Sequence, residues 1–210
     1  MKTLDLRKDL KQFYAPPAKK VELVDVPEFQ FAVIDGAIEP GAEPGNSPAF
    51  ASAIQALYGI SYTLKFASKL RKVDPIDYPV MVLEGLWWVE VGEFSIERKD
   101  NYVWTVMILH PEHITPEMFE EARAQVRKKQ GDSLALAQLR LERFREGLCV
   151  QMLHVGPYAD EPATVAKMDA FAAEHGYVMR GKHHEIYMGD PRRAAPEKLK
   201  TVLRHPVEKA

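Results

Sequence analysis

The chain has 210 residues, and its 28 lysines and arginines against 30 aspartates and glutamates give a formal charge of -2. A chain so close to neutral has no overall field to hold a phosphate backbone, so we expect no nucleic-acid partner. The single cysteine excludes an internal disulfide framework and a cysteine-rich zinc site. The N-terminus has no apolar signal region and no run of about 18 apolar residues occurs, so we expect a cytoplasmic protein with no membrane partner.

The first half of the chain begins with an extended arm and continues into a strand and a helix. We expect residues 1–27 to form the N-terminal arm. Apolar residues concentrate over residues 28–38, which predicts a strand that ends at a glycine. A helix then follows from a polar cap at Asn46 or Ser47 to about Leu70, because apolar residues recur there at helical spacing.

Two further strands complete the first half, over residues 80–91 and 102–109, with residues 97–100 as their hairpin connection. A second helix is predicted from Thr115 to Gly131. Threonine is a favourable cap, the proline after it suits the first helical position, and glycine suits the stop. These features make the helix the most sharply bounded element of the sequence.

The second half repeats the order of the first. Residues 133–144 fit neither the helical nor the strand period, so they receive no assignment. The elements after them are a strand over residues 147–155, a helix that ends at Gly176, a strand over residues 182–190 and an extended segment over residues 199–207.

Each half therefore runs strand, helix, strand, strand. This order predicts an α+β fold of tandem strand-helix-strand-strand modules with pseudo-two-fold symmetry, antiparallel sheets and a central ligand cleft. We expect one domain over residues 28–210. Within it, module one spans residues 28–110, a connecting helical segment 111–144 and module two 145–207.

The candidate functional acid is Glu185, in the middle of the strand over residues 182–190. Side chains alternate across a strand, so Ile186 should lie beneath a helix, while His183, Glu185 and Tyr187 share the opposite face. A carboxylate between two rings is costly to bury unless it is hydrogen-bonded, protonated or paired with a cation. A solvated sheet face would show the same alternation, so the pattern alone leaves both interpretations open.

Aromatic residues from both halves are candidates to surround this acid. Tyrosine and tryptophan offer apolar area with one polar handle, and their ring faces attract cations. An acid among such rings favours a flat, lipophilic ligand that carries positive charge or a proton to exchange. Parity within residues 80–91 places Trp88 on the face that we expect to meet Glu185. The candidate ligand-binding residues are Trp88, Tyr102, Trp104, His183 and Tyr58, with Tyr158 and Tyr187 as candidate catalytic partners of Glu185.

Several familiar catalytic motifs are missing from the sequence. It contains no glycine-rich phosphate loop, no Gly-x-Ser-x-Gly and no His-Glu-x-x-His, which disfavours nucleotide hydrolysis, a serine esterase and a zincin. His183 and Glu185 are only two potential metal ligands, separated by one residue. We therefore expect neither a metal nor a cofactor.

Three segments resemble the GyrI-like small-molecule-binding proteins: residues 83–88 (LEGLWW), 150–158 (VQMLHVGPY) and 183–187 (HHEIY), the last followed by DPRR. The resemblance extends over about the whole chain and implies a tandem strand-helix-strand-strand fold. In the regulators of this family, a buried glutamate at the position that matches Glu185 meets cationic drugs in an aromatic pocket. Similar stand-alone members include enzymes that open the strained cyclopropane of DNA-alkylating natural products with water. The resemblance implies Glu185 as the central acid, with Trp88, Tyr158 and Tyr187 as pocket lining.

The sequence leaves three functions open. The first is a binding protein that captures lipophilic or cationic aromatic compounds, with a protective effect against toxic ones. The second is a hydrolase in which Glu185 takes a proton from water that attacks a strained carbon, while Tyr158 or Tyr187 stabilises the oxygen that gains charge. The third, less favoured, is an interaction module without a ligand. The missing helix-turn-helix argues against transcriptional regulation.

Overall fold

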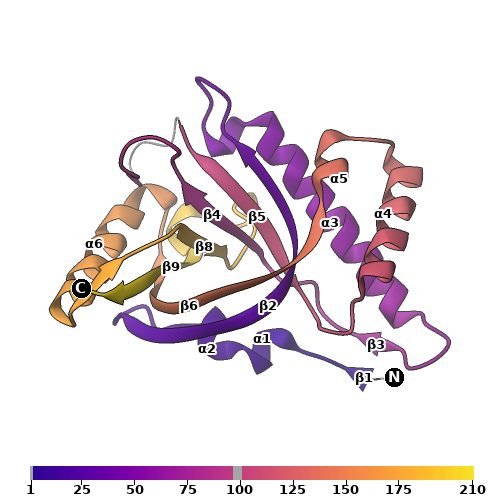
Figure 1. Cartoon of the computed structure of the whole chain (residues 1–210), viewed down its shortest axis with the longest axis horizontal. Helices are drawn as coiled ribbons and strands as arrows, with labels where there is room; N and C mark the ends of the chain where they lie inside the picture. Colours follow the sequence, from indigo (N-terminus) through magenta and orange to yellow (C-terminus); the bar gives the residue numbers. More distant parts are fainter. Residues whose placement is uncertain (1, 97–100) are drawn as a thin grey trace.

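The computed structural model describes residues 2–96 and 101–210, so the predicted connection at residues 97–100 lies outside the described residues (Figure 1). Seven strands form one antiparallel sheet in the order β6-β2-β5-β4-β8-β9-β7, and a further pairing of β6 with β9 closes it. The sheet therefore has an inner and an outer face. Its strands are β2 (Glu22–Ala37), β4 (Leu83–Trp88), β5 (Val103–His110), β6 (Arg140–Val155), β7 (Tyr177–Met179), β8 (His183–Tyr187) and β9 (Lys200–Lys209).

Two long helices flank the closed sheet, α3 against β2 and β5 and α6 against β6 and β9 (Figure 1). Among the described residues, no helix is both long and apolar enough to cross a membrane. The helices are α1 (Leu6–Asp9), α2 (Lys11–Tyr14), α3 (Pro48–Lys69), α4 (Pro116–Gln130), α5 (Leu134–Gln138) and α6 (Glu161–Glu174). Shorter elements are the 3-10 turns η1 (Pro44–Asn46), η2 (Tyr158–Asp160) and η3 (Pro196–Lys198), and the parallel pair β1 (Lys2–Thr3) and β3 (Ile76–Asp77).

The strand pairings confirm the predicted tandem modules. Exchanging β2, α3, β4 and β5 with β6, α6, β8 and β9 maps the pairing of β2 with β5 onto that of β6 with β9. It also maps the pairing of β4 with β5 onto that of β8 with β9. The two halves join through β2 with β6 and through β4 with β8, so they build one closed sheet rather than separate sheets.

The helix ends were predictable because local hydrogen bonds define them. The Ser47 hydroxyl accepts from the backbone N–H of Phe50 at 3.1 Å and begins α3. Thr115 does the same for Met118 at 3.3 Å, and α4 ends at Gly131, whose φ of 84° suits glycine. These caps confirm the predicted start of α3 and both predicted ends of α4.

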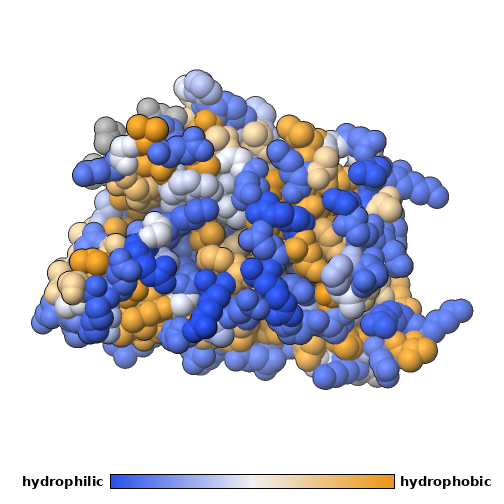
Figure 2. Space-filling model, in the orientation of Figure 1, coloured by the Kyte–Doolittle hydropathy of each residue, from blue (hydrophilic) through white to orange (hydrophobic). Residues whose placement is uncertain are grey.

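Two strands start earlier than predicted. β2 begins at Glu22, inside the expected arm, and β6 begins at Arg140 rather than at residue 147. These segments pair with each other from Glu22 opposite Gln151 to Val33 opposite Arg140. The start of β6 is rich in charge and has no apolar run, so pairing with β2 makes it a strand. The face over β2 and β6 is correspondingly hydrophilic (Figure 2).

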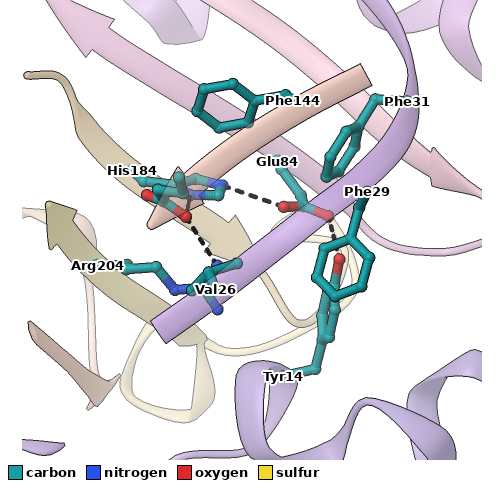
Figure 3. Close-up of a pocket in the computed structure, with 9 residues that line it drawn as sticks. Tyr14, Val26, Phe29, Phe31, Glu84, Phe144, His184 and Arg204 are labelled. Carbon is teal, nitrogen blue, oxygen red and sulfur yellow. Dashed lines mark hydrogen bonds and ion pairs between the residues drawn. The ribbon is translucent and has the colours of Figure 1, made fainter. Parts of the chain in front are cut away.

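The inner face of the closed sheet contains a buried ionic cluster, which we call the inner clamp: Tyr14, Glu84, Glu146, His184 and Arg204 (Figure 3). The Tyr14 hydroxyl donates to Glu84 Oε1 at 2.6 Å, and His184 Nε2 lies 3.1 Å from Glu84 Oε2. His184 Nδ1 lies 3.0 Å from Glu146 Oε1, and Arg204 Nη1 donates to Glu146 Oε2 at 3.1 Å. All five side chains are at most 4% exposed.

The charges of the inner clamp balance. Burial disfavours the charged form of His184, but Glu146 and Glu84 overcome this and raise its pKa to about 9. Burial likewise opposes the charge of Glu146, yet His184 and Arg204 lower its pKa to about 2. At neutral pH two carboxylates therefore face an imidazolium and a guanidinium, which is the condition for tolerating buried ions.

The clamp predicts a loss of stability in mild alkali. Because the pKa of His184 is raised on folding, its contribution to the free energy of unfolding is complete below about pH 6.5 and is lost as the pH rises through about 9. In urea titrations we expect the free energy of unfolding to fall by roughly 3 kcal/mol from this group. His184→Gln should lack this part of the decrease, whereas parallel curves for the two proteins would contradict the assignment. NMR titration of the ring measures the same pKa directly.

Candidate functional site

Strand register determines which tryptophan meets the predicted acid. On the outer face, Glu185 lies opposite Gly85 of β4, and His183 lies opposite Trp87. Directly opposed residues of antiparallel strands point to the same face, so Trp87 shares the face of Glu185. The prediction that Trp88 shares it is wrong, because parity within one strand says nothing of its register with another. Trp88 instead lies under the Lys182 ammonium, 3.4 Å from the ring centroid.

Ile186 also differs from the prediction. It lies opposite Glu84 on the inner face and is fully buried inside the closed sheet, not beneath a helix. The helices cover the outer face instead, where Phe50 of α3 contacts Trp87 with ring centroids 5.2 Å apart. A closed sheet can bury both of its faces, and this allows the face of Glu185 to be the one beneath the helices.

A hydrogen-bonded chain leads to the carboxylate, and we call it the outer triad: Trp87, Tyr187 and Glu185. Trp87 Nε1 donates to Tyr187 Oη at 3.1 Å, and the Tyr187 hydroxyl donates to Glu185 Oε2 at 2.7 Å. Glu185 is 6% exposed, and its Oε1 lies 3.6 Å from His183 Nε2. Burial and the charge of Glu185 raise the pKa of Tyr187 well above its usual value, so Tyr187 remains a donor at neutral pH.

Gly85 makes room for this chain. A Cβ atom there would lie 2.9 Å from Trp87 Nε1 and 3.2 Å from the Tyr187 hydroxyl oxygen. Because Gly85 has no side chain, the Trp87 indole and the Tyr187 phenol can come together over its Cα atom. On β2, Gly36 has the same relation to Trp104, whose ring would lie 2.2 Å from an added Cβ.

Some other predicted residues lie next to the outer triad. Tyr158, on η2, approaches the Tyr187 ring edge-on with centroids 6.0 Å apart. Tyr102 lies 5.6 Å from the Trp87 ring and donates from its hydroxyl to the Ser95 carbonyl oxygen at 2.7 Å. The structure therefore brings tyrosines of both halves to Glu185.

Two predicted residues lie further from the acid. Trp104 is buried and contacts the Phe50 ring at 5.4 Å, so it connects to Trp87 through Phe50. Tyr58 is on α3, where its ring stacks on Tyr62 at 6.3 Å. Neither ring contact involves Glu185 directly.

Sequence reasoning missed a second carboxylate, Glu161, at the start of α6. Glu161 is fully buried. The pKa of Tyr158 is raised to about 12, first by the burial of Tyr158 itself and then by Glu161 and Glu185. The same two acids also raise the pKa of Tyr102 and of Tyr187. The signal in the sequence was an acidic residue before a proline at a helix start, where the helix dipole favours a carboxylate.

Phe94 was missed as well, and it stacks on both Tyr102 and His183, with centroids 5.1 and 5.7 Å away. Among the described residues, no group of three histidine, cysteine, aspartate or glutamate side chains is placed to hold a metal ion. The side chains around Glu185 are acids, phenols and aromatic rings, which can provide charge attraction, stacking and proton transfer.

Gly85→Ala should disrupt the outer triad. The added methyl group forces Trp87 or Tyr187 aside and should destabilise the fold by about 1 to 3 kcal/mol, the usual effect of overpacking. The Trp87 indole N–H resonance, identified by its loss in Trp87→Phe, should shift as the bond to Tyr187 breaks. Gly189→Ala is the matched control, since no atom lies within 4 Å of its added Cβ. An unchanged resonance in Gly85→Ala would show that the rings do not depend on this glycine.

Comparison with known proteins gives consistent results. Comparison with curated sequences gave no significant match. An uncharacterized conserved protein from Listeria innocua is 41% identical, with a TM-score of 0.87, over 98% of this chain and 100% of that one. A hydrolase encoded by lin2189 from Listeria innocua is 40% identical, with a TM-score of 0.83, over 99% and 100%. Another structure, of a hydrolase from Listeria innocua, is 38% identical, with a TM-score of 0.81, over 98% and 100%.

A family model also matches almost the entire chain. The model of the GyrI-like small molecule binding domain matches residues 19–208, which include both modules, the inner clamp except Tyr14, and the whole outer triad. This agrees with the resemblance carried by the segments around Gly85, Tyr158 and Glu185. The chain belongs to the GyrI-like small molecule binding domain family.

Proposed function

We propose that this chain captures flat, lipophilic aromatic compounds, cationic ones included, against the outer triad, and so protects against toxic compounds. The observation that carries the proposal is the buried Glu185 carboxylate, held by Tyr187 at 2.7 Å among aromatic rings of both halves. A carboxylate in such surroundings favours a ligand that brings positive charge, and ring faces favour cations too. Phe50, at the start of α3, contacts Trp87 of the triad, and Glu161, at the start of α6, adds to the effect of burial on the pKa of Tyr158.

A second function is hydrolysis of an electrophilic ligand. The names of two structures about 40% identical to this chain call them hydrolases, which supports this second function. Glu185 and Tyr187 pair a candidate base with a phenol that stays protonated at neutral pH. This pair suits the opening of a strained cyclopropane conjugated to a carbonyl group, which needs a base for water and a hydrogen-bond donor for oxygen.

The proposed step adds one water molecule. Glu185 takes a proton as the water oxygen bonds to a cyclopropane carbon and the strained C–C bond breaks. The electron pair of the broken C–C bond moves through the conjugated system to the carbonyl oxygen, which accepts a hydrogen bond from Tyr158 or Tyr187. The proton on Glu185 then passes to that oxygen. The product has an alcohol at the former cyclopropane carbon and an enol or phenol hydroxyl at the former carbonyl.

Glu185→Gln tests whether the charge of Glu185 contributes to the binding of cationic ligands. The amide keeps the shape of the side chain and can still accept from Tyr187, but it has no charge. We expect affinity for N-methylacridinium to fall by about 1 to 3 kcal/mol, the range for losing a charged partner, while affinity for neutral N-methylacridone stays the same. Fluorescence titration measures both dyes. Glu121→Gln, at an exposed position, is the matched control, and equal effects on the two dyes would contradict charge recognition.

The same variant tests hydrolysis. A spirocyclopropane-fused cyclohexadienone is a simple probe, because water converts it into a hydroxyethyl phenol with a different absorbance. A general base typically contributes a hundredfold or more, so Glu185→Gln should lose turnover by about that factor while it still binds the probe. If wild type gives no rate above buffer, the chain only captures its ligand. If the glutamine variant retains the full rate, Glu185 is not the base.

A further inference from the structure

The inner clamp lies directly behind the outer triad, on the other face of the same two strands. Glu84 precedes Gly85 on β4, and His184 precedes Glu185 on β8. Because side chains alternate, Glu84 points inward next to Gly85, which makes room for the triad, and His184 points inward next to Glu185 of the triad. The two faces of this strand pair therefore carry different chemistry.

The backbone pairing between the two strands that carry the triad is short. β4 and β8 face each other over four residue pairs, from Glu84 opposite Ile186 to Trp87 opposite His183. The contact of His184 Nε2 with Glu84 Oε2, at 3.1 Å, ties these strands together by their side chains. His184 Nδ1 also contacts Glu146 of β6 at 3.0 Å, across β9, which pairs with both β8 and β6.

The N-terminal arm completes this arrangement from a remote part of the sequence. The Tyr14 hydroxyl donates to Glu84 at 2.6 Å, and burial together with the Glu84 charge raises the pKa of Tyr14 well above its usual value. Arg204 donates to the Phe13 carbonyl oxygen, and Gln151 Nε2 donates to the Gln12 carbonyl oxygen at 2.7 Å. The arm is thus bonded to β4, β6 and β9.

The inner clamp is not itself a second ligand site. The cavity beside it measures about 10 Å³, close to the smallest that can hold one water molecule. Phe29, Phe31 and Phe144 line the same cavity as the charged groups (Figure 3). Each clamp side chain already bonds another, so the cluster has a geometric role rather than a recognition role.

We propose that the inner clamp holds the outer triad in place, with Glu84 and His184 as positioning residues and Tyr14 as the contribution of the N-terminal arm. The clamp fixes β8 against β4 and thereby sets the Trp87, Tyr187 and Glu185 side chains on the opposite face. Its effect on ligand affinity rests on the proposed function, whereas its effect on the triad does not.

The test separates positioning from general destabilisation. Glu84→Ala removes the link between Tyr14 and His184, and we expect it to shift the Trp87 indole N–H resonance in the protein without ligand. Glu84→Gln should shift the resonance less than Glu84→Ala does, because the glutamine fills the same space and its amide oxygen can still accept from Tyr14. Val33→Ala is the control, since Val33 lies on the inner face opposite Met107 and not in the clamp. It loses packing alone and should leave the resonance in place.

Ligand affinity provides the second measurement. Glu84→Ala should bind N-methylacridinium about two- to thirtyfold more weakly, the usual range for residues that act through a network. A shifted resonance with unchanged affinity supports the clamp and counts against the ligand site. An unmoved resonance in Glu84→Ala, or an equal shift in Val33→Ala, overturns the clamp. If Glu84→Ala does not fold, Tyr14→Phe replaces it, because this variant keeps the ring and removes only the hydroxyl. A shifted Trp87 resonance would again support the clamp, and an unmoved one would overturn it.

Discussion

The pairing of β4 with β8 is the constraint on which the rest of the structure depends. These strands join the two halves, and their register places Glu185 over Gly85 and Trp87 beside His183. A register shifted by one residue would turn every side chain of one strand to the other face. The acid would then point into the closed sheet and His184 out of it. Both the outer triad and the inner clamp require this one alignment.

The two faces handle buried charge in different ways. Inside, the carboxylates of Glu84 and Glu146 are matched by His184 and Arg204, so the ions satisfy one another. Outside, the Tyr187 hydroxyl donates to Glu185, whose Oε1 lies 3.6 Å from His183 Nε2, and burial together with Glu185 and Glu161 raises the pKa of Tyr187. The inner group balances its charges within the fold, whereas the outer group is the one against which we propose that a ligand binds.

Much of the architecture could be predicted because its signals are local. Caps at Ser47 and Thr115 define helices through bonds to residues three positions away, and the repeated element order gives the two modules. Alternation along β8, together with the family resemblance, made Glu185 the candidate acid. Trp87 could not be distinguished from Trp88, since register arises between strands 100 residues apart in the sequence. Tyr14 gave no signal, because its partner Glu84 lies 70 residues away.

The inner clamp has a further consequence for how the two halves are matched. Buried ions generally stabilise a fold less than well-packed apolar side chains would, so their presence here calls for another role. Apolar side chains inside the closed sheet could repack after a slip of the strands, since their contacts have no direction. His184 must meet Glu84 of the first half and Glu146 of the second at the same time, and few alignments of the halves allow both. The clamp therefore specifies the alignment of the two modules, and the position of Glu185 follows from that alignment.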